Sequence, residues 1–321
     1  MDNSTSVPLD QQIDAMMQPV ASLASQFIFF SVELFGSEIP LIVLWLIGGG
    51  LFFTFYLRFI NFRGFMHAID ILRGKFVDPN DPGQISQFQA LTTAVSGTVG
   101  IGNIAGVAVA ISIGGPGATF WLIVAGLLGM STKLAECTLG VMYRRYQDGV
   151  VSGGPMYYLE KGLSSRGWPR LGRGLGVFYA LSMVIGCLGI GNMFQSNQAA
   201  SILVSVTGGE SSIFADQLWV LGLVLAAGVG VVIIGGIKSI AATTARMVPG
   251  MALLYVLTAL FVILINWDKV PGAFVSIWMG AFAPDGVTGG IIGVMIIGFR
   301  RAVFSNEAGL GSAAIAHSTA R

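Results

Sequence analysis

The sequence carries a run of residues without a single charge, from 90 to 132, bounded by Gln89 and Lys133. One membrane span needs about 20 apolar residues, so the run is long enough for two spans. The run is also interrupted by helix-breaking residues: Gly97, Gly100, Gly102 and Gly106, then Gly114, Gly115, Pro116 and Gly117. Because an unpaired backbone group in lipid costs several kcal/mol, a span with this composition must find partners for its freed N–H and C=O groups.

Two readings explain glycines inside a span. Small residues let helices pack closely, as in Gly-x-x-x-Gly pairs. Alternatively, an unwound segment at mid-membrane holds a small polar ligand or an ion. The polar residues Ser96, Thr98 and Asn103, which lie among these glycines, favour the binding site.

Composition extends the membrane prediction to the whole chain. Of its 321 residues, 54% are hydrophobic and 10% are charged, and the mean hydropathy is +0.77. Soluble domains carry about 25% charged residues. The net charge of +1 indicates no nucleic-acid partner. Cys137 and Cys187 lie in apolar runs, and His67 and His317 are far apart, so we expect no disulfide, bound cofactor or enzymatic centre.

The hydropathy pattern predicts an all-α polytopic membrane protein with about seven spans. These are residues 39–57, 88–113 (broken near 97–103), 118–142, 175–206, 214–235, 247–265 and a last span from about 287. Residues 1–38 read as an extracytoplasmic segment with a surface helix within 20–35, and residues 271–283 as a re-entrant or surface helix.

Basic residues predict the orientation of the spans. Twelve Lys or Arg residues follow the first, third and fifth spans, whereas the opposite side carries only Lys269. Basic loops stay in the cytoplasm. We therefore expect a multi-pass plasma (inner) membrane protein with its N-terminus outside and Arg321 in the cytoplasm.

Polar residues inside the spans are the candidate site. At an unwound point, the amides around Thr98 and Gly102 can hold a carboxylate, while carbonyls and the Asn103 side chain suit a hard cation such as Na⁺. Asn192, Gln195 and Gln198 recur every three residues, on one helix face. With Phe194 they either line a polar cavity or form interhelical hydrogen bonds.

Charged residues mark two further positions. Lys133 and Glu136 are three residues apart, which suits a structural ion pair or a brace for a gate. Arg300, Arg301 and Glu307 flank a second glycine-containing stretch. There a helix either stops near Gly298 and restarts near Ala308, capped by residues 305–307, or simply ends in a cytoplasmic loop.

Three segments resemble signatures of the alanine or glycine:cation symporter family. They are residues 97–106 (GTVGIGNIAG), 114–121 (GGPGATFW) and 304–312 (FSNEAGLGS), and the resemblance covers residues 35–321. One small departure is Leu122-Ile123, where the family often has Met-Trp.

The resemblance implies a leucine-transporter-like fold of two inverted five-helix repeats after a leading helix. Residues 88–266 would form the first repeat and 271–321 the start of the second, so that the chain ends after core helix six. It implies uptake of alanine or glycine coupled to Na⁺, or to H⁺, by alternating access. The second interpretation is a truncated, non-transporting membrane fragment or an assembly partner of such a symporter.

The resemblance also assigns roles to residues. Thr98 and Gly102 would bind the amino acid's carboxylate, with Gln195, Phe194 and Asn192 as the facing wall. Asn103 would lie near one Na⁺, and the carbonyls of Ser96 and Val99 near another. Gating or structural roles remain for four charged residues: Lys133, Glu136, Arg301 and Glu307.

Overall fold

The structure is a computed structural model that describes residues 15–19, 22–23, 26, 30–34, 37–78, 80–214, 217–283 and 290–321. In these residues, four helices are long and apolar enough to cross a membrane: Gln87–Gly114, Ala118–Met142, Pro169–Val206 and Gly236–Ile265. Two shorter apolar helices are Leu41–Tyr56 and Leu218–Ile234. The chain is a multi-pass membrane protein built mainly of α-helices.

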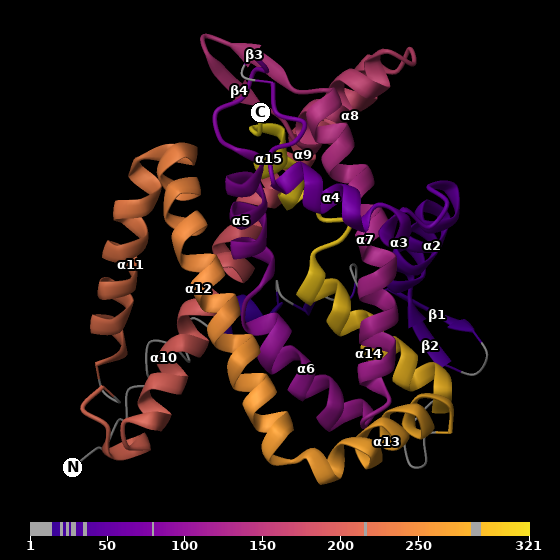
Figure 1. The fold of residues 1–321 in the computed structure, drawn as a ribbon, viewed down its shortest axis with the longest axis vertical. Coiled ribbons are helices and arrows are strands. Elements are labelled where there is room, and N and C mark those ends of the chain that lie inside the picture. The colour runs from indigo at the N-terminus through magenta and orange to yellow at the C-terminus, as the bar shows by residue number, and fades with distance from the viewer. Residues whose placement is uncertain are drawn as a thin grey trace.

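The elements follow one another along the chain as shown in Figure 1. The first part contains β1 (Ser31–Leu34), β2 (Ser37–Pro40), α2 (Leu41–Tyr56), α3 (Ile60–Arg63), α4 (Phe65–Leu72), α5 (Gln87–Thr98), α6 (Ile101–Gly114) and α7 (Ala118–Met142). The middle contains β3 (Arg145–Gln147), β4 (Val150–Ser152), α8 (Pro155–Ser164), α9 (Pro169–Gly186), α10 (Phe194–Val206) and α11 (Leu218–Ile234). The last part contains α12 (Gly236–Ile265), α13 (Val270–Phe282), α14 (Gly290–Asn306) and α15 (Ser312–Ser318).

The predicted broken span is confirmed. Helix α5 begins with a capping box, in which Ser86 and Gln89 exchange hydrogen bonds, and it ends at Thr98. Val99 (ψ 105°) and Gly100 (φ −154°, ψ −152°) are extended, and α6 begins at Ile101. The interruption is thus two residues long.

A second helix is also broken, but not where the sequence suggested. Helix α14 continues through Gly298 to Asn306, and α15 begins at Ser312 rather than near Ala308. The interrupted segment is residues 307–311, in which Glu307, Gly309 and Gly311 have φ values of 51°, 93° and 79°. Glycine adopts such angles readily, as Gly309 and Gly311 do here, whereas they are uncommon for a residue such as Glu307. A right-handed helix cannot continue through residues with these angles.

Helix α7 is the central support of both broken helices, because it packs against α14, α15, α2 and α6. A buried cluster of Val43, Ala125, Phe299 and Ala302 joins α2, α7 and α14. The backbones approach closely at Gly298, where an added Cβ would lie 2.6 Å from Cβ of Trp121. Small residues thus allow α14 to run along α7.

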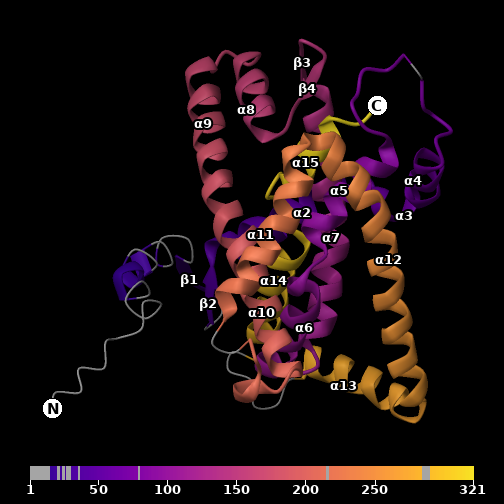
Figure 2. The same cartoon turned by 90° about the vertical axis from the view of Figure 1, so that its left-hand side faces the viewer.

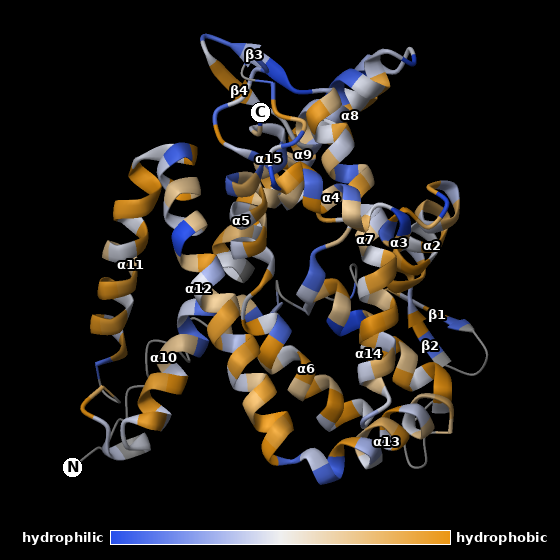
Figure 3. Ribbon diagram, viewed as in Figure 1, coloured by the Kyte–Doolittle hydropathy of each residue, from blue (hydrophilic) through white to orange (hydrophobic). Residues whose placement is uncertain are grey.

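The remaining helices surround this centre. Helices α11 and α12 form a pair at one side, and α13 crosses one end of the molecule between α12 and α14 (Figure 1). The β3–β4 hairpin, α8 and the C-terminal residue gather at the other end (Figures 1 and 2). Apolar residues dominate α11 and the α13-proximal half of α12, while hydrophilic residues gather near the hairpin (Figure 3).

Four expectations about elements need correction. Residues 31–34, predicted as part of a surface helix, instead pair with residues 37–40 as two antiparallel strands. The alternation of Val32 and Leu34 suits a strand. The rest of the predicted surface helix lies largely outside the described residues. The fourth span contains a π-helical segment, Cys187–Met193. The sixth begins eleven residues earlier, at Gly236. The segment between the third and fourth spans, expected as a loop, contains β3, β4 and α8.

Candidate functional site

The two interruptions lie against each other. The side chain of Asn103, in the first turn of α6, donates from Nδ2 to the carbonyl oxygen of Ser305 at 3.5 Å. A Cβ placed on Gly102 would lie 3.1 Å from Cδ1 of Phe304 and 3.5 Å from Cα of Ser305. Residue 102 must therefore be small for α6 and α14 to meet at this point.

At the first break, some backbone N–H groups have no hydrogen-bond partner within a helix. The first four N–H groups of a helix have no partner within it. The N–H of Gly100 donates to Oδ1 of Asn103 at 2.9 Å. The amides of Ile101 and Gly102 begin α6, where partial positive charge accumulates. Thr98 and Ser96 donate their hydroxyls to carbonyls of α5, at Ala94 (2.9 Å) and Thr93 (2.7 Å), so their oxygens can still accept or ligate.

Two residues of helix α10 lie next to the breaks. A Cβ on Gly100 would lie 3.4 Å from Oε1 and 3.5 Å from Nε2 of Gln195. The rings of Phe194 and Phe304 meet edge to face, with centroids 5.7 Å apart. Asn192 differs: it lies in the π-helical segment, where the three-residue spacing no longer keeps side chains on one face, and its carbonyl accepts from Ser196.

A cavity of about 290 Å³ lies between α6, α7 and α14, and Asn103 is part of its lining. Its polar lining is Asn103, Thr119, Ser305 and Asn306, and its apolar lining is Val107, Leu122, Ile123, Gly126 and Ala302. The side chain of Asn103 therefore reaches both the meeting point of the breaks and this cavity.

The second break is held by side chains of other helices. Glu136 on α7 is 8% exposed, and its two carboxylate oxygens accept from the N–H groups of Gly309 and Gly311, the latter at 3.2 Å. Tyr179 on α9 donates to the carbonyl of Leu310 at 3.0 Å. The predicted ion pair of Lys133 with Glu136 is absent: in the described part of the chain the ion pairs are Lys75–Asp70 and Arg145–Glu160.

The other predicted charged residues lie close to this break. Glu307 accepts from the hydroxyl of Ser312 at 2.5 Å across the break, and Arg301 is half-buried on α14, one turn before Ser305. The expected cap by residues 305–307 takes another form, because Oδ1 of Asn306 accepts from the N–H of Ala308 at 2.9 Å. This hydrogen bond closes a turn and does not cap the start of a helix.

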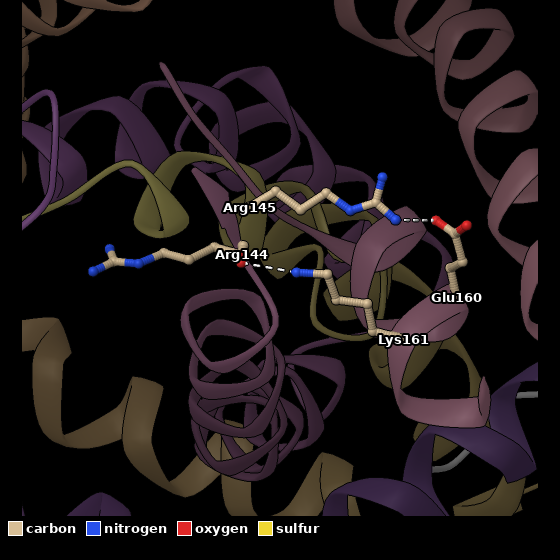
Figure 4. Close-up of polar contacts among 4 residues, drawn as sticks. All are labelled: Arg144, Arg145, Glu160 and Lys161. Carbon is tan, nitrogen blue, oxygen red and sulfur yellow. Dashed lines mark hydrogen bonds and ion pairs between the residues drawn. The ribbon is translucent and has the colours of Figure 1, made fainter. Parts of the chain in front are cut away.

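A polar cluster holds the N-terminal end of α5 and the C-terminal ends of α7 and α15 together. Arg144, just after α7, donates to the carbonyls of Ser318 (3.1 Å) and Ala320 (2.7 Å). Ile85, before α5, pairs with Ala320 in a short parallel bridge. Figure 4 shows Lys161 donating to the Arg144 carbonyl at 3.0 Å and Arg145 paired with Glu160 at 2.8 Å. Both broken helices are thus tied at the same end of the molecule.

Several residues of the site were not predicted from the sequence. Phe304 and Ser305 meet the first break, and Tyr179 holds the second, yet Tyr179 looked like one more apolar residue of a span. The signal for Phe304 was its position at the start of the third family-like segment; Ser305 had the same signal and was also part of the expected cap at residues 305–307. Nothing in the sequence indicated Tyr179.

Comparison with known proteins agrees with these features. The family model described as the sodium:alanine symporter family matches residues 22–321. The sodium/alanine symporter AgcS of Methanococcus maripaludis is 44% identical over 88% of this chain and 60% of its own length. The probable sodium/glutamine symporter GlnT of Bacillus subtilis is 36% identical over 87% and 56%, and the amino-acid carrier protein AlsT of the same organism is 38% identical over 86% and 56%.

The chain spans about 60% or less of the length of these curated relatives. The family match, however, runs through both broken helices and every element between them. This chain belongs to the sodium:alanine symporter family.

Proposed function

We propose that this chain takes part in Na⁺-coupled symport of a small neutral amino acid, alanine or glycine, across the plasma membrane. The observation that carries the proposal is the meeting of two interrupted helices at Asn103 and Ser305, 3.5 Å apart. Interrupted helices at mid-membrane present backbone groups to a substrate and to its coupling ion. The name of the relative AgcS supports sodium and alanine as the pair.

The amino acid's carboxylate would bind at the start of α6. The amides of Ile101 and Gly102 and the positive end of the helix favour an anion there. Thr98 would add its hydroxyl, and Gln195 would face the substrate from α10. The edge-to-face pair of Phe194 and Phe304 would cover the apolar side of a small substrate.

Sodium would travel with the substrate as a second cargo. Na⁺ prefers oxygen ligands, which are offered here by Oδ1 of Asn103, on the side of Gly100, and by the carbonyl of Ser305. The carbonyls of Ser96 and Val99, at the end of α5, would form part of a second position. The alternative coupling ion is H⁺, so the test varies the cation.

Alternating access would require the tied ends of α5 and α15 to separate. With the orientation proposed here, the cluster around Arg144 lies in the cytoplasm and closes the inner side. The hydrogen bonds from Arg144 to Ser318 and Ala320 would break when this side opens.

The test is binding of labelled alanine to the purified chain, in parallel with uptake into vesicles that carry it, with Na⁺ or choline as the cation. We expect Na⁺-dependent binding that Thr98→Val and Asn103→Ala reduce by at least tenfold. Binding and uptake equal to those of empty vesicles at every Na⁺ concentration would refute the proposal. Unchanged affinity in both variants would refute the assignment of the site.

A further inference from the structure

The second break differs from the first in the way its backbone is satisfied. Glu136 contributes a carboxylate from α7, and the N–H groups of Gly309 and Gly311 both donate to it. The left-handed φ values of these two glycines, 93° and 79°, turn alternate amides towards one side. Such a pair of amides forms a small anion-binding concavity.

The amides at the start of α6 have no such carboxylate among the described hydrogen bonds; the one side chain that accepts there is the neutral Asn103, from Gly100. The two breaks are therefore not equivalent. A ligand's carboxylate can use the first break, whereas at the second break the chain's own carboxylate already holds the amides.

Glu136 is connected to the candidate site through a short stretch of chain. Gly309 lies four residues after Ser305, and between them Ala308 and Asn306 close a turn through a 2.9 Å hydrogen bond. A Cβ on Gly129 of α7 would lie 2.7 Å from Nδ2 of Asn306, so α7 also contacts this turn directly. A shift of the break would move Phe304 and Ser305 relative to Gly102 and Asn103.

Tyr158 and Lys133 are among the titratable neighbours of Glu136. Burial, and then the carboxylate of Glu136, raise the pKa of the Tyr158 phenol on α8 to about 12, so this neighbour stays neutral. The ammonium of Lys133 is buried on the same helix without a hydrogen bond in the described residues.

We propose that Glu136 is a positioning residue, whose carboxylate occupies the amides of the second break as a built-in ligand and fixes Phe304 and Ser305 against the first break. It touches neither substrate nor ion. Only the binding readout of the experiment below rests on the proposed function.

The first measurement needs no substrate. Hydrogen exchange of the purified chain is compared between wild type, Glu136→Gln and Glu136→Ala, with Glu160→Gln as the matched control. Glu160 pairs with Arg145 on the surface of α8, away from both breaks. We expect exchange at Gly309 and Gly311 to accelerate at least tenfold in both Glu136 variants and not in the control. Wild-type exchange at these amides in the folded variants would overturn the proposal.

The second measurement separates positioning from mere destabilisation. A variant that only unfolds part of the sample lowers the number of alanine sites and leaves their Kd unchanged. For Glu136→Gln we expect a Kd raised about tenfold at an unchanged number of sites, with Glu136→Asp in between and Glu160→Gln like wild type. An unchanged Kd in Glu136→Gln would also overturn the proposal. If wild type itself binds no alanine, the proposed function fails, and the exchange measurement still decides the role of Glu136.

Discussion

The side-chain amide of Asn103 bridges two interrupted helices. Its Oδ1 accepts from the N–H of Gly100 within the first break, and its Nδ2 donates to the carbonyl of Ser305 at 3.5 Å, just before the second break. One side chain thus fixes the shape of the first break and its distance from the second. Both an acceptor and a donor are needed, which an amide provides and a carboxylate does not.

Asn103→Asp and Asn103→Ala should separate these two functions. Asp keeps the acceptor for Gly100 and loses the donor to Ser305, whereas Ala loses both. We expect Ala to lower the affinity for alanine more than tenfold. The half-buried N–H of Gly100 then has no acceptor, which costs about 1–3 kcal/mol, and the first break loses the contact that fixes its shape. We expect Asp to weaken the affinity as well, while it preserves slow exchange of the Gly100 amide. Equal exchange at Gly100 in the two variants, measured by mass spectrometry, would contradict this division.

Gly102→Ala tests the close approach of α6 and α14. The added methyl group would lie 3.1 Å and 3.2 Å from two ring carbons of Phe304 and would push this ring away. We expect a lower melting temperature and weaker alanine binding. The control is Gly97→Ala, in the last turns of α5, where no atom lies within 4 Å of the new Cβ; it should be neutral or stabilising by up to about 1 kcal/mol. The idea fails if both variants melt at the same temperature.

Arg144→Gln should loosen the cluster at the end of α15. It removes the charged donor to the carbonyls of Ser318 and Ala320. The neighbouring Arg145→Gln removes an exposed ion pair with Glu160, worth about 0–1 kcal/mol, and the contact of Arg145 with the ring of Tyr157. The measurement is maleimide labelling of Thr319→Cys, a buried position, in a background with Cys137 and Cys187 replaced by serine. We expect labelling about tenfold faster with Arg144→Gln and unchanged with Arg145→Gln. The reverse order would exclude Arg144 as the main contact.

Gly117→Ala tests the turn between α6 and α7. A Cβ at this position would lie 2.0 Å from the carbonyl carbon of Gly280 on α13, so the two backbones must separate. We expect a loss of about 1–3 kcal/mol in the free energy of unfolding, typical of overpacking. Gly106→Ala on α6, with no atom within 4 Å, serves as the control and should retain the wild-type value. Unfolding in denaturant distinguishes the two, and equal midpoints would contradict the expected overlap.

Local sequence determined where several of the long apolar helices lie and that two of the helices are interrupted. The length of apolar runs sets where a helix can cross a membrane, and residues 118–142 form the helix that this pattern predicts. Glycine with neighbouring polar residues marked the first break, at Val99 and Gly100. Local composition was less reliable for the second break, which lies at residues 307–311 and not near Gly298, because glycine inside a helix also serves close packing.

Only the tertiary structure decided which partners the polar residues have. Lys133 and Glu136 have the spacing of an ion pair, yet the carboxylate is directed to Gly309 and Gly311, about 175 residues further along the chain. The amides of Asn192 and Gln195 look alike in sequence, yet Asn192 lies in the π-helical segment and Gln195 lies in α10, so their spacing does not keep them on one face. Spacing along a helix reports which side chains share a face, whereas the partner of a buried polar group depends on which distant backbone the packing of small residues brings within reach.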